Sequence, residues 1–204
     1  MGKLILTDFD QTLFDTGKLV KEMTKIFRDY GGLDFCKTMP QDSNGNYSLV
    51  RHIELVLPRA KRRRTIRRLD QLLSRSSDFL FDDAVDFLQQ CSVFFLVLIT
   101  RGEKAYQSRK VFPALRTCRH LFKQIIICED EKVKHILDLF KRVGPDEIFF
   151  VDDKINEFEP VKKAIPAIKT ILISRIGLTK VDPGSDFAVS NLVEAAKIIL
   201  STGG

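Results

Sequence analysis

The sequence predicts an α/β protein with a doubly wound parallel sheet and a small all-helical domain inserted after the first strand. Continuously apolar runs at 93–99, 124–128, 147–151 and 169–174 alternate with amphipathic stretches. Such alternation is typical of parallel strands joined by helices. The runs do not alternate with polar residues, as expected for a sheet that is covered on both faces. Another apolar run, 3–9, precedes roughly 80 residues without a convincing strand.

The block between the first two strands is too long for a loop and has helical patterns of its own. We therefore expect a core of residues 1–15 and 80–204 and a helical cap of residues 16–79 over the carboxyl edge of the sheet. Residues 37–47 are rich in turn-forming residues and predict a loop. Helices are predicted at 17–30, 48–57, 59–75, 82–91, 103–117, 131–143, 155–164 and 190–200.

Length and composition are those of a globular protein: 204 residues, 44% of them hydrophobic and 29% charged. No apolar run approaches the roughly 20 residues of a membrane helix, and a strand-like run begins almost at the N-terminus. We therefore predict a cytoplasmic protein without membrane contact. The four cysteines (Cys36, Cys91, Cys118 and Cys128) include no CxxC pair, so buried free thiols are expected rather than a disulfide framework or a zinc site.

The positive charge of the chain is concentrated in one predicted helix. The formal net charge is +6, and residues 59–75 carry eight basic residues and one acid, which leaves −1 for the rest. Such a segment is typical of a solvated helix face. It also permits binding of nucleic acid, since clustered arginines neutralise phosphates. The candidate contacts are Arg62, Arg63, Arg64 and Arg67, but no aromatic residue lies among them to stack on bases.

Two aspartates, Asp8 and Asp10, end the first apolar run. Residues i and i+2 of a strand point to the same side, so their carboxylates would repel each other unless a cation or a proton intervenes. An aspartate can also attack phosphorus and form an acyl-phosphate. A neighbouring carboxylic acid can protonate the leaving alkoxide and later deprotonate water. The pair of aspartates therefore suits an enzyme that transfers or hydrolyses phosphoryl groups.

Three further strand ends carry polar groups that suit the same chemistry. Asp152 and Asp153 end another run, and Asp8 with Asp152 would supply the oxygen ligands that magnesium prefers. The Thr100 hydroxyl and the backbone amide of Arg101 are candidate phosphate ligands at a helix start. Lys132 begins the helix after the third predicted strand and would supply a fixed positive charge, with Lys134 as the alternative.

These four elements, in this order, resemble the haloacid dehalogenase superfamily. The segment from Asp8 to Phe14 (DFDQTLF) is similar to its first motif, DxDxT, and the other three motifs match mainly by order and spacing. The resemblance covers residues 1–15 and about 80–175. It implies a Rossmann-like core with a helical cap of the first type between the first two motifs. Gln11 departs from it, because glycine is common there, as does the run 164–166 (Ala-Ile-Pro).

The resemblance also implies roles for the residues at the four strand ends. Asp8 would be the nucleophile and Asp10 the general acid and base. Thr100 and Lys132 would bind phosphate. Magnesium would be held by Asp8, Asp152 and the backbone carbonyl of Asp10, with Asp153 holding a metal-bound water or orienting Lys132. Glu157 or Asn156 would provide a further ligand.

The sequence therefore predicts a magnesium-dependent phosphatase of small phosphorylated metabolites. Asp10 favours phosphoryl chemistry over dehalogenation, because a halide leaving group needs no acid. A phosphotransferase or mutase would retain both aspartates and stays an alternative, as does nucleic-acid binding through the arginine-rich helix.

Overall fold

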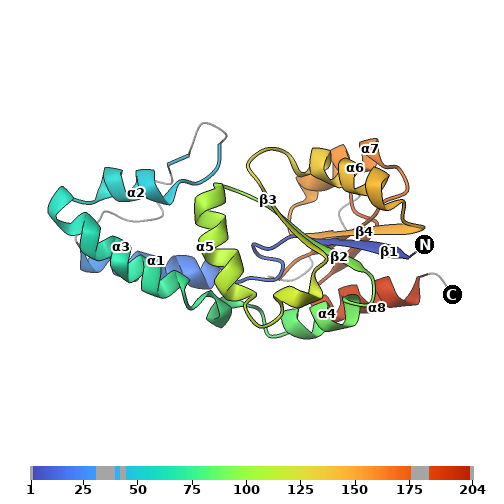
Figure 1. Cartoon of the computed structure of the whole chain (residues 1–204), viewed down its shortest axis with the longest axis horizontal. Helices are drawn as coiled ribbons and strands as arrows, with labels where there is room; N and C mark the ends of the chain where they lie inside the picture. The colour runs from blue at the N-terminus through green and yellow to red at the C-terminus, as the bar shows by residue number, and fades with distance from the viewer. Residues whose placement is uncertain (1, 31–39, 42–44, 176–183, 203–204) are drawn as a thin grey trace.

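The computed structural model describes residues 2–30, 40–41, 45–175 and 184–202 (Figure 1). Its centre is a sheet of six parallel strands in the order β3-β2-β1-β4-β5-β6, which confirms the predicted doubly wound fold. The strands are β1 (Lys3–Thr7), β2 (Phe95–Arg101), β3 (Gln124–Cys128), β4 (Glu147–Asp152), β5 (Lys169–Ile173) and β6 (Phe187–Val189). The order steps outward in both directions from β1, so the carboxyl ends of β1, β2 and β4 lie side by side.

Helices cover both faces of the sheet, which explains the continuously apolar strands. One face packs against α4 (Ala84–Cys91), α5 (Lys104–Ala114) and α8 (Leu192–Ser201). The other face packs against α6 (Lys132–Val143) and α7 (Phe158–Ala164). Alternate residues of β1 divide between the two layers: Ile5 belongs to the first and Leu4 and Leu6 to the second. Each central strand is thus buried on both sides.

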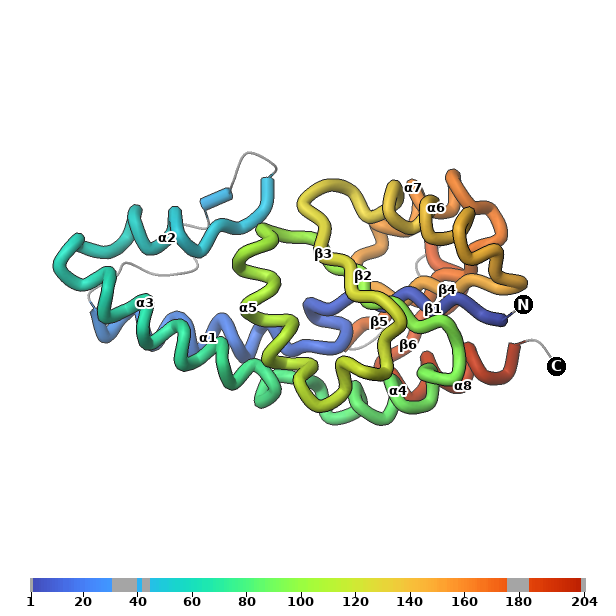
Figure 2. The backbone as a smooth tube through the Cα atoms, in the orientation of Figure 1, coloured from blue at the N-terminus to red at the C-terminus, as the bar shows by residue number. Residues whose placement is uncertain are grey.

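The block between β1 and β2 is helical, as predicted. It contains α1 (Thr16–Asp29), α2 (Leu49–Val56), α3 (Arg59–Leu73) and a 3₁₀ turn, η2 (Ser76–Phe79). These helices extend from one end of the sheet, with α1 and α3 running side by side (Figure 2). Their buried side chains belong to the same apolar cluster as α4, α5 and α8. The helical insert is therefore packed onto the core by a continuous apolar interior.

Residues typical of helix starts precede the three α-helices of the insert. The Asp15 carboxylate accepts a hydrogen bond from the Lys18 amide at the start of α1, and Ser48 accepts one from the Arg51 amide at the start of α2. Pro58 precedes α3, as is common at a helix start. The Arg62 guanidinium donates to the carbonyls of Leu57 and Glu54 and thereby covers the end of α2.

Several element ends differ from the sequence prediction. The first strand ends at Thr7 rather than residue 9, and a turn follows. The helix expected at 103–117 ends at Ala114, one residue after Pro113. The helix expected from 155 begins as a 3₁₀ turn, η4 (Ile155–Glu157). A sixth strand, β6, was not predicted, because three residues are too short to show a pattern.

Three cysteines, Cys91, Cys118 and Cys128, are buried and free, as predicted, whereas Cys36 lies outside the described residues. The same is true of residues 37–39 and 42–44 within the predicted loop 37–47. Within the described part of the chain, no helix has the length and apolar character needed to cross a membrane.

Replacing Phe149 by alanine should strongly destabilise the protein. Phe149 is fully buried in β4 beside β1, and truncating such a side chain leaves a cavity that costs roughly 3–5 kcal/mol. Urea denaturation followed by circular dichroism measures the loss. Phe112→Ala is the matched control, because Phe112 is 38% exposed. Equal losses for the two variants would contradict this packing.

Candidate active site

The carboxyl edge of the sheet contains a cavity of about 470 Å³. The register of the strands places Asp8, the residue after β1, beside Asp152 at the end of β4, because Thr7 pairs with Val151. Thr100 near the end of β2 and Lys132 at the start of α6 reach the same place. Residues from all four predicted strand ends line the cavity: Asp8, Asp10, Thr100, Arg101, Lys132 and Asp153.

The Lys132 ammonium lies between two carboxylates at the floor of the cavity. Its Nζ is 2.6 Å from Asp8 Oδ1 and 2.6 Å from Asp152 Oδ2. All three side chains are buried. The remaining Asp152 oxygen accepts a hydrogen bond of 2.9 Å from the Lys154 amide, and Val151 accepts one from the Asp8 amide. Backbone contacts on both strands therefore fix the two carboxylates around one ammonium.

Burial is the largest influence on the pKa values of Asp8 and Lys132. Desolvation raises the pKa of Asp8 to about 8; the attraction of Lys132 opposes this shift, and the charges of Asp152 and Asp10 add to it. Desolvation alone would lower the pKa of Lys132, but the two adjacent carboxylates more than offset it and raise that pKa above its usual range. Lys132 is therefore a permanent cation, and burial opposes the charge of the Asp8 carboxylate beside it.

Asp153 completes an oxygen cluster suited to a divalent metal. Carboxylate oxygens of Asp8, Asp152 and Asp153 lie within 4.8 Å of one another. One Asp153 oxygen, Oδ1, is buried and makes no hydrogen bond. Burial and the charge of Asp152 raise the pKa of Asp153 to about 6. A hard cation with oxygen ligands would satisfy this oxygen and offset the crowded negative charge, so the residues present fit magnesium.

Asp10 occupies a different environment, although it lies only two residues from Asp8. Its carboxylate accepts hydrogen bonds from the Thr16 hydroxyl at 2.6 Å, the Gln107 amide at 2.8 Å and the Lys110 ammonium at 2.6 Å. Burial by itself would raise the pKa of Asp10, but Lys110 and these hydrogen bonds outweigh it and hold that pKa below its usual value. Asp10 is therefore ionised, whereas burial and the neighbouring carboxylates push the pKa of Asp8 in the opposite direction.

Sequence reasoning did not identify Gln107 and Lys110 as site residues. Both lie on α5 and are buried on the same helix face as Val111 and Ala114. The Lys110 ammonium also lies over the ring of Phe9, 5.8 Å from its centroid. The available signal was a polar pair at i and i+3 on an otherwise apolar helix face.

The two residues at the end of β2 differ in their placement. Thr100 is buried, and its Oγ1 lies 3.4 Å from Gln107 Nε2. Arg101 is exposed at the rim, with its guanidinium 3.9 Å from the Glu157 carboxylate. Gly102 then has a positive φ of 157°, and a Cβ on it would approach the Gln107 side chain to 2.8 Å. Glycine at position 102 thus leaves room for the Gln107 side chain, which donates a hydrogen bond to Asp10.

The structure distinguishes between the residues that the sequence left open. Lys132 is at the cavity floor, whereas Lys134 is exposed and 3.3 Å from Asp130. Asn156 and Glu157 both line the cavity. Gln11, where a glycine was expected, adopts a positive φ of 58° in the turn that follows β1. Glycine adopts that left-handed conformation without strain, which explains why glycine is common at this position, and Gln11 keeps the same conformation.

Comparison with known proteins defines the fold class. No protein-family model matches the sequence, and no curated protein matches it either. Solved structures do: a haloacid dehalogenase-like hydrolase from Burkholderia xenovorans has a TM-score of 0.75 at 16% identity, over 98% of this chain and 96% of its own. A magnesium-bound hydrolase of the same type from Bacillus subtilis has a TM-score of 0.66 at 15% identity, over 98% and 99%.

A third similar structure is L-2-haloacid dehalogenase from Xanthobacter autotrophicus, with a TM-score of 0.62 at 14% identity over 100% of both chains. These likenesses span nearly the whole length of each protein. The chain therefore has the fold of the haloacid dehalogenase-like hydrolases, as the motifs predicted. Sequence identities this low define the fold and leave the reaction to be argued from the site.

Replacing Lys132 by methionine should destabilise the protein far more than Lys134→Met. Loss of Lys132 leaves buried carboxylates without their ammonium partner, which costs about 3–5 kcal/mol. Lys134 forms an exposed pair, and such pairs contribute less than about 1 kcal/mol. Urea denaturation of both variants at neutral pH measures the difference. Similar free energies of unfolding would contradict the central role of Lys132.

Proposed function

We propose that the chain is a magnesium-dependent phosphohydrolase of the haloacid dehalogenase superfamily that acts on small phosphorylated metabolites. The observation that carries this proposal is the pairing of two differently tuned aspartates in one cavity. Asp8 lies against Lys132 and the acidic residues of β4, and Asp10 is held by Thr16, Gln107 and Lys110. The first arrangement suits a nucleophile beside bound phosphate, and the second suits an acid and base.

In the first step, a carboxylate oxygen of Asp8 would attack phosphorus while the bond from phosphorus to the alkoxide breaks. The alkoxide takes a proton from Asp10, and an acyl-phosphate remains on Asp8. Lys132 and the Thr100 hydroxyl would bind phosphoryl oxygens. The negative charge of a bound phosphate raises the pKa of Asp10, which supplies the protonated form that this step requires.

In the second step, water would attack the phosphorus of the acyl-phosphate. Asp10, now a carboxylate, takes the proton from water, and the bond from phosphorus to the Asp8 oxygen breaks to release inorganic phosphate. The low pKa of Asp10 in the free protein suits this role as base. The contact with Gln107 keeps the carboxylate directed at the cavity throughout.

Asp8, Asp152 and Asp153 would hold the magnesium ion, with the Asp10 carbonyl as a further ligand. When bound, the ion would offset the charge of the carboxylates and of the incoming phosphate. The unpartnered oxygen of Asp153 and the crowding of three acids support this assignment. The magnesium-bound hydrolase from Bacillus subtilis, which has the same fold, also supports it.

The helical insert, residues 16–79, would act as a cap that selects the substrate. Val20, Asn46 and Tyr47 from this block line the cavity opposite the sheet edge. Side chains in that position exclude water during the attack of Asp8. They would contact the leaving group rather than the phosphate, so the identity of the substrate would depend on them.

Two other classes of enzyme with this fold, dehalogenases and phosphotransferases, would use similar residues. A dehalogenase needs a nucleophilic aspartate but no acid for its halide, so the elaborate support of Asp10 favours phosphoryl transfer. A phosphotransferase or mutase would pass the phosphoryl group from Asp8 to a hydroxyl instead of water. An ionised Asp10 would accept a proton from water or from a hydroxyl group alike, and we propose hydrolysis as the reaction that needs no second substrate.

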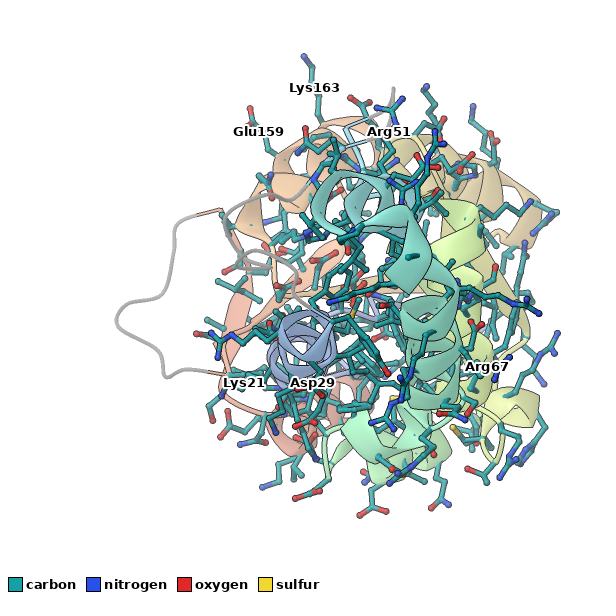
Figure 3. All side chains as sticks on the ribbon, turned by 90° about the vertical axis from the view of Figure 1, so that its left-hand side faces the viewer. Lys21, Asp29, Arg51, Arg67, Glu159 and Lys163 are labelled. Atoms are coloured by element: carbon teal, nitrogen blue, oxygen red, sulfur yellow. The ribbon has the colours of Figure 1, made fainter. Side chains whose placement is uncertain are left out.

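Nucleic-acid binding is a second candidate function, favoured by the arginines of α3. Arg63, Arg64 and Arg67 are exposed on α3 and form no ion pair with a carboxylate in the described part of the chain. Figure 3 shows Arg67 at the surface of this end of the molecule. Arg62 differs, because it covers the end of α2. Retention on RNA that falls steeply with salt would support this function.

Asp8→Asn should abolish magnesium-dependent release of phosphate from a generic aryl phosphate, because the amide is a poor nucleophile. The protein should remain folded, since Lys132 keeps its contact with Asp152. A colorimetric phosphate assay measures turnover, and acid quenching with labelled substrate detects the acyl-phosphate in the unmodified protein. The unmodified protein should release no halide from 2-chloropropionate.

Asp138→Asn serves as the control for this experiment, because Asp138 is exposed on α6 and does not line the cavity. Undiminished turnover in Asp8→Asn, or halide release without phosphate release, would overturn the proposed function.

Lys110→Met should move the acidic limb of the phosphatase pH profile to higher pH. Lys110 holds the pKa of Asp10 down; without that charge, burial dominates and the pKa of Asp10 rises. The carboxylate form needed to deprotonate water then appears only at higher pH. The profile of kcat against pH measures this shift. Lys110→Arg keeps the charge and should retain the original limb; an unchanged limb in both variants would contradict the assignment of Asp10.

A further inference from the structure

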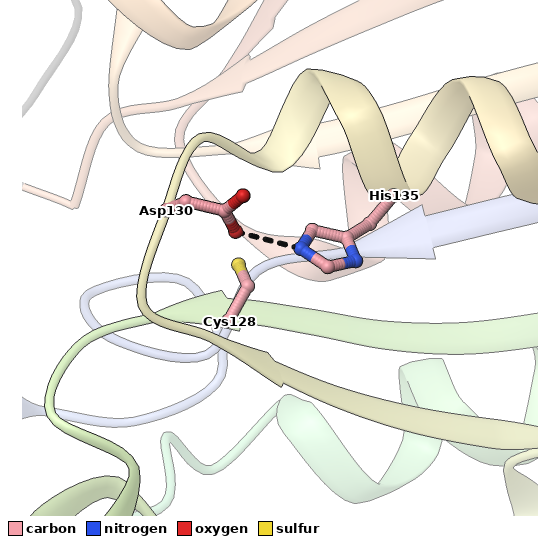
Figure 4. Close-up of side chains that lie close together, drawn as sticks. All are labelled: Cys128, Asp130 and His135. Carbon is pink, nitrogen blue, oxygen red and sulfur yellow. Dashed lines mark hydrogen bonds and ion pairs between the residues drawn. The ribbon is translucent and has the colours of Figure 1, made fainter.

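We propose that Cys128, Asp130 and His135 form a second cation site, which binds a borderline-soft divalent ion such as Zn²⁺. The sulfur, a carboxylate oxygen and a ring nitrogen of these residues lie within 4.8 Å of one another (Figure 4). This site is separate in chemistry from the oxygen cluster of Asp8, Asp152 and Asp153. It does not depend on the proposed phosphatase activity.

The backbone places the three donors at one turn of the chain. Cys128 is the last residue of β3, Asp130 lies in the following loop, and His135 is in the first turn of α6. His135 Nε2 is 2.8 Å from Asp130 Oδ1, and the Cys128 sulfur faces the same pair. Ligands at normal Zn²⁺ distances lie roughly 3.4–3.8 Å apart in tetrahedral geometry. Small side-chain rotations would therefore bring all three onto one ion.

The donor types select the kind of ion. Thiolate and imidazole favour Zn²⁺ and similar transition metals, whereas magnesium binds through oxygen. Asp130 is 51% exposed and His135 is 36% exposed, so an ion can enter from solvent and keep a water as fourth ligand. The sequence argued against a zinc site because no CxxC pair is present; here the donors come from a strand end, a loop and a helix.

The present partners of these residues compete only weakly with an ion. The Cys128 thiol donates to the Thr100 carbonyl at 3.4 Å, and Lys134 lies 3.3 Å from Asp130. The Lys134–Asp130 pair is exposed and contributes little free energy, and the thiol of Cys128 is only a weak hydrogen-bond donor. Burial raises the pKa of Cys128 to about 11, so binding must displace the thiol proton to solvent. Cys91 and Cys118 have no comparable neighbours among the described residues.

Titration with Co²⁺, a spectroscopic substitute for Zn²⁺, tests the site. One equivalent should produce a near-ultraviolet band from thiolate-to-metal charge transfer, and Zn²⁺ but not millimolar Mg²⁺ should abolish it. Cys128→Ser should remove the band. His135→Gln, a change at a residue that is 36% exposed, should weaken binding at least tenfold, because losing a direct ligand should cost no less than the roughly tenfold typical of residues that only support the ligands.

Two control variants distinguish this site from the remaining thiols and from the oxygen cluster. Cys118→Ser removes another buried free thiol, and Asp153→Asn disturbs the oxygen cluster; the band should persist in both. A band that survives in Cys128→Ser, equal affinity in His135→Gln, loss of the band in Asp153→Asn, or no band in the unmodified protein would each overturn the proposal.

Discussion

The Lys132 ammonium, shared by Asp8 and Asp152, is the interaction on which the arrangement of the site depends. Three charged side chains are buried together at the ends of two strands and the start of a helix. Burying charges is costly unless each finds its partner, so β1, β4 and α6 must keep their relative positions. The apolar residues of β1 and β4, packed between helices on both faces, provide that rigidity. The packing of the sheet therefore provides the fixed positions that the buried ion pairs of the site require.

That constraint also separates the roles of two neighbouring aspartates. Asp8 faces other carboxylates and desolvation, which push its pKa up. Asp10 lies beyond the end of β1 and meets Lys110, which pushes its pKa down. Pairs of titratable groups whose environments shift their pKa values in opposite directions are typical of acid and base assignments. A two-residue spacing gives different functions only because the chain turns after Asp8.

The sequence predicted those parts of the site that follow from strand ends. Continuous apolar runs mark where Asp8, Thr100 and Asp152 must lie, because parallel strands end at one edge. The sequence could not decide between Lys132 and Lys134, since both begin the same helix. Two residues rotate by about 200° around a helix, so only the packing of α6 onto the sheet decides which lysine faces the cavity.

Gln107 and Lys110 were missed for a related reason. Polar residues on a helix usually face solvent, and their burial arises from contacts with Asp10, about 100 residues away in the chain. The ends of the cap, 16 and 79, stay predictions, because the apolar interior of the helical insert continues into that of the core. No break in packing marks a boundary there.

The edge of the sheet also shows how one fold presents different donors to different cations. Buried carboxylates at β1 and β4 give an all-oxygen cluster, whereas β3, one strand beyond β2, ends in a thiol beside an imidazole. Hard and borderline-soft ions sort between such clusters by ligand type rather than by charge. The loop between Cys128 and Lys132 belongs to both environments. Lys132 lies between Asp130 and His135 in the chain, so an ion held by those two residues would restrain the same segment that positions the central ammonium.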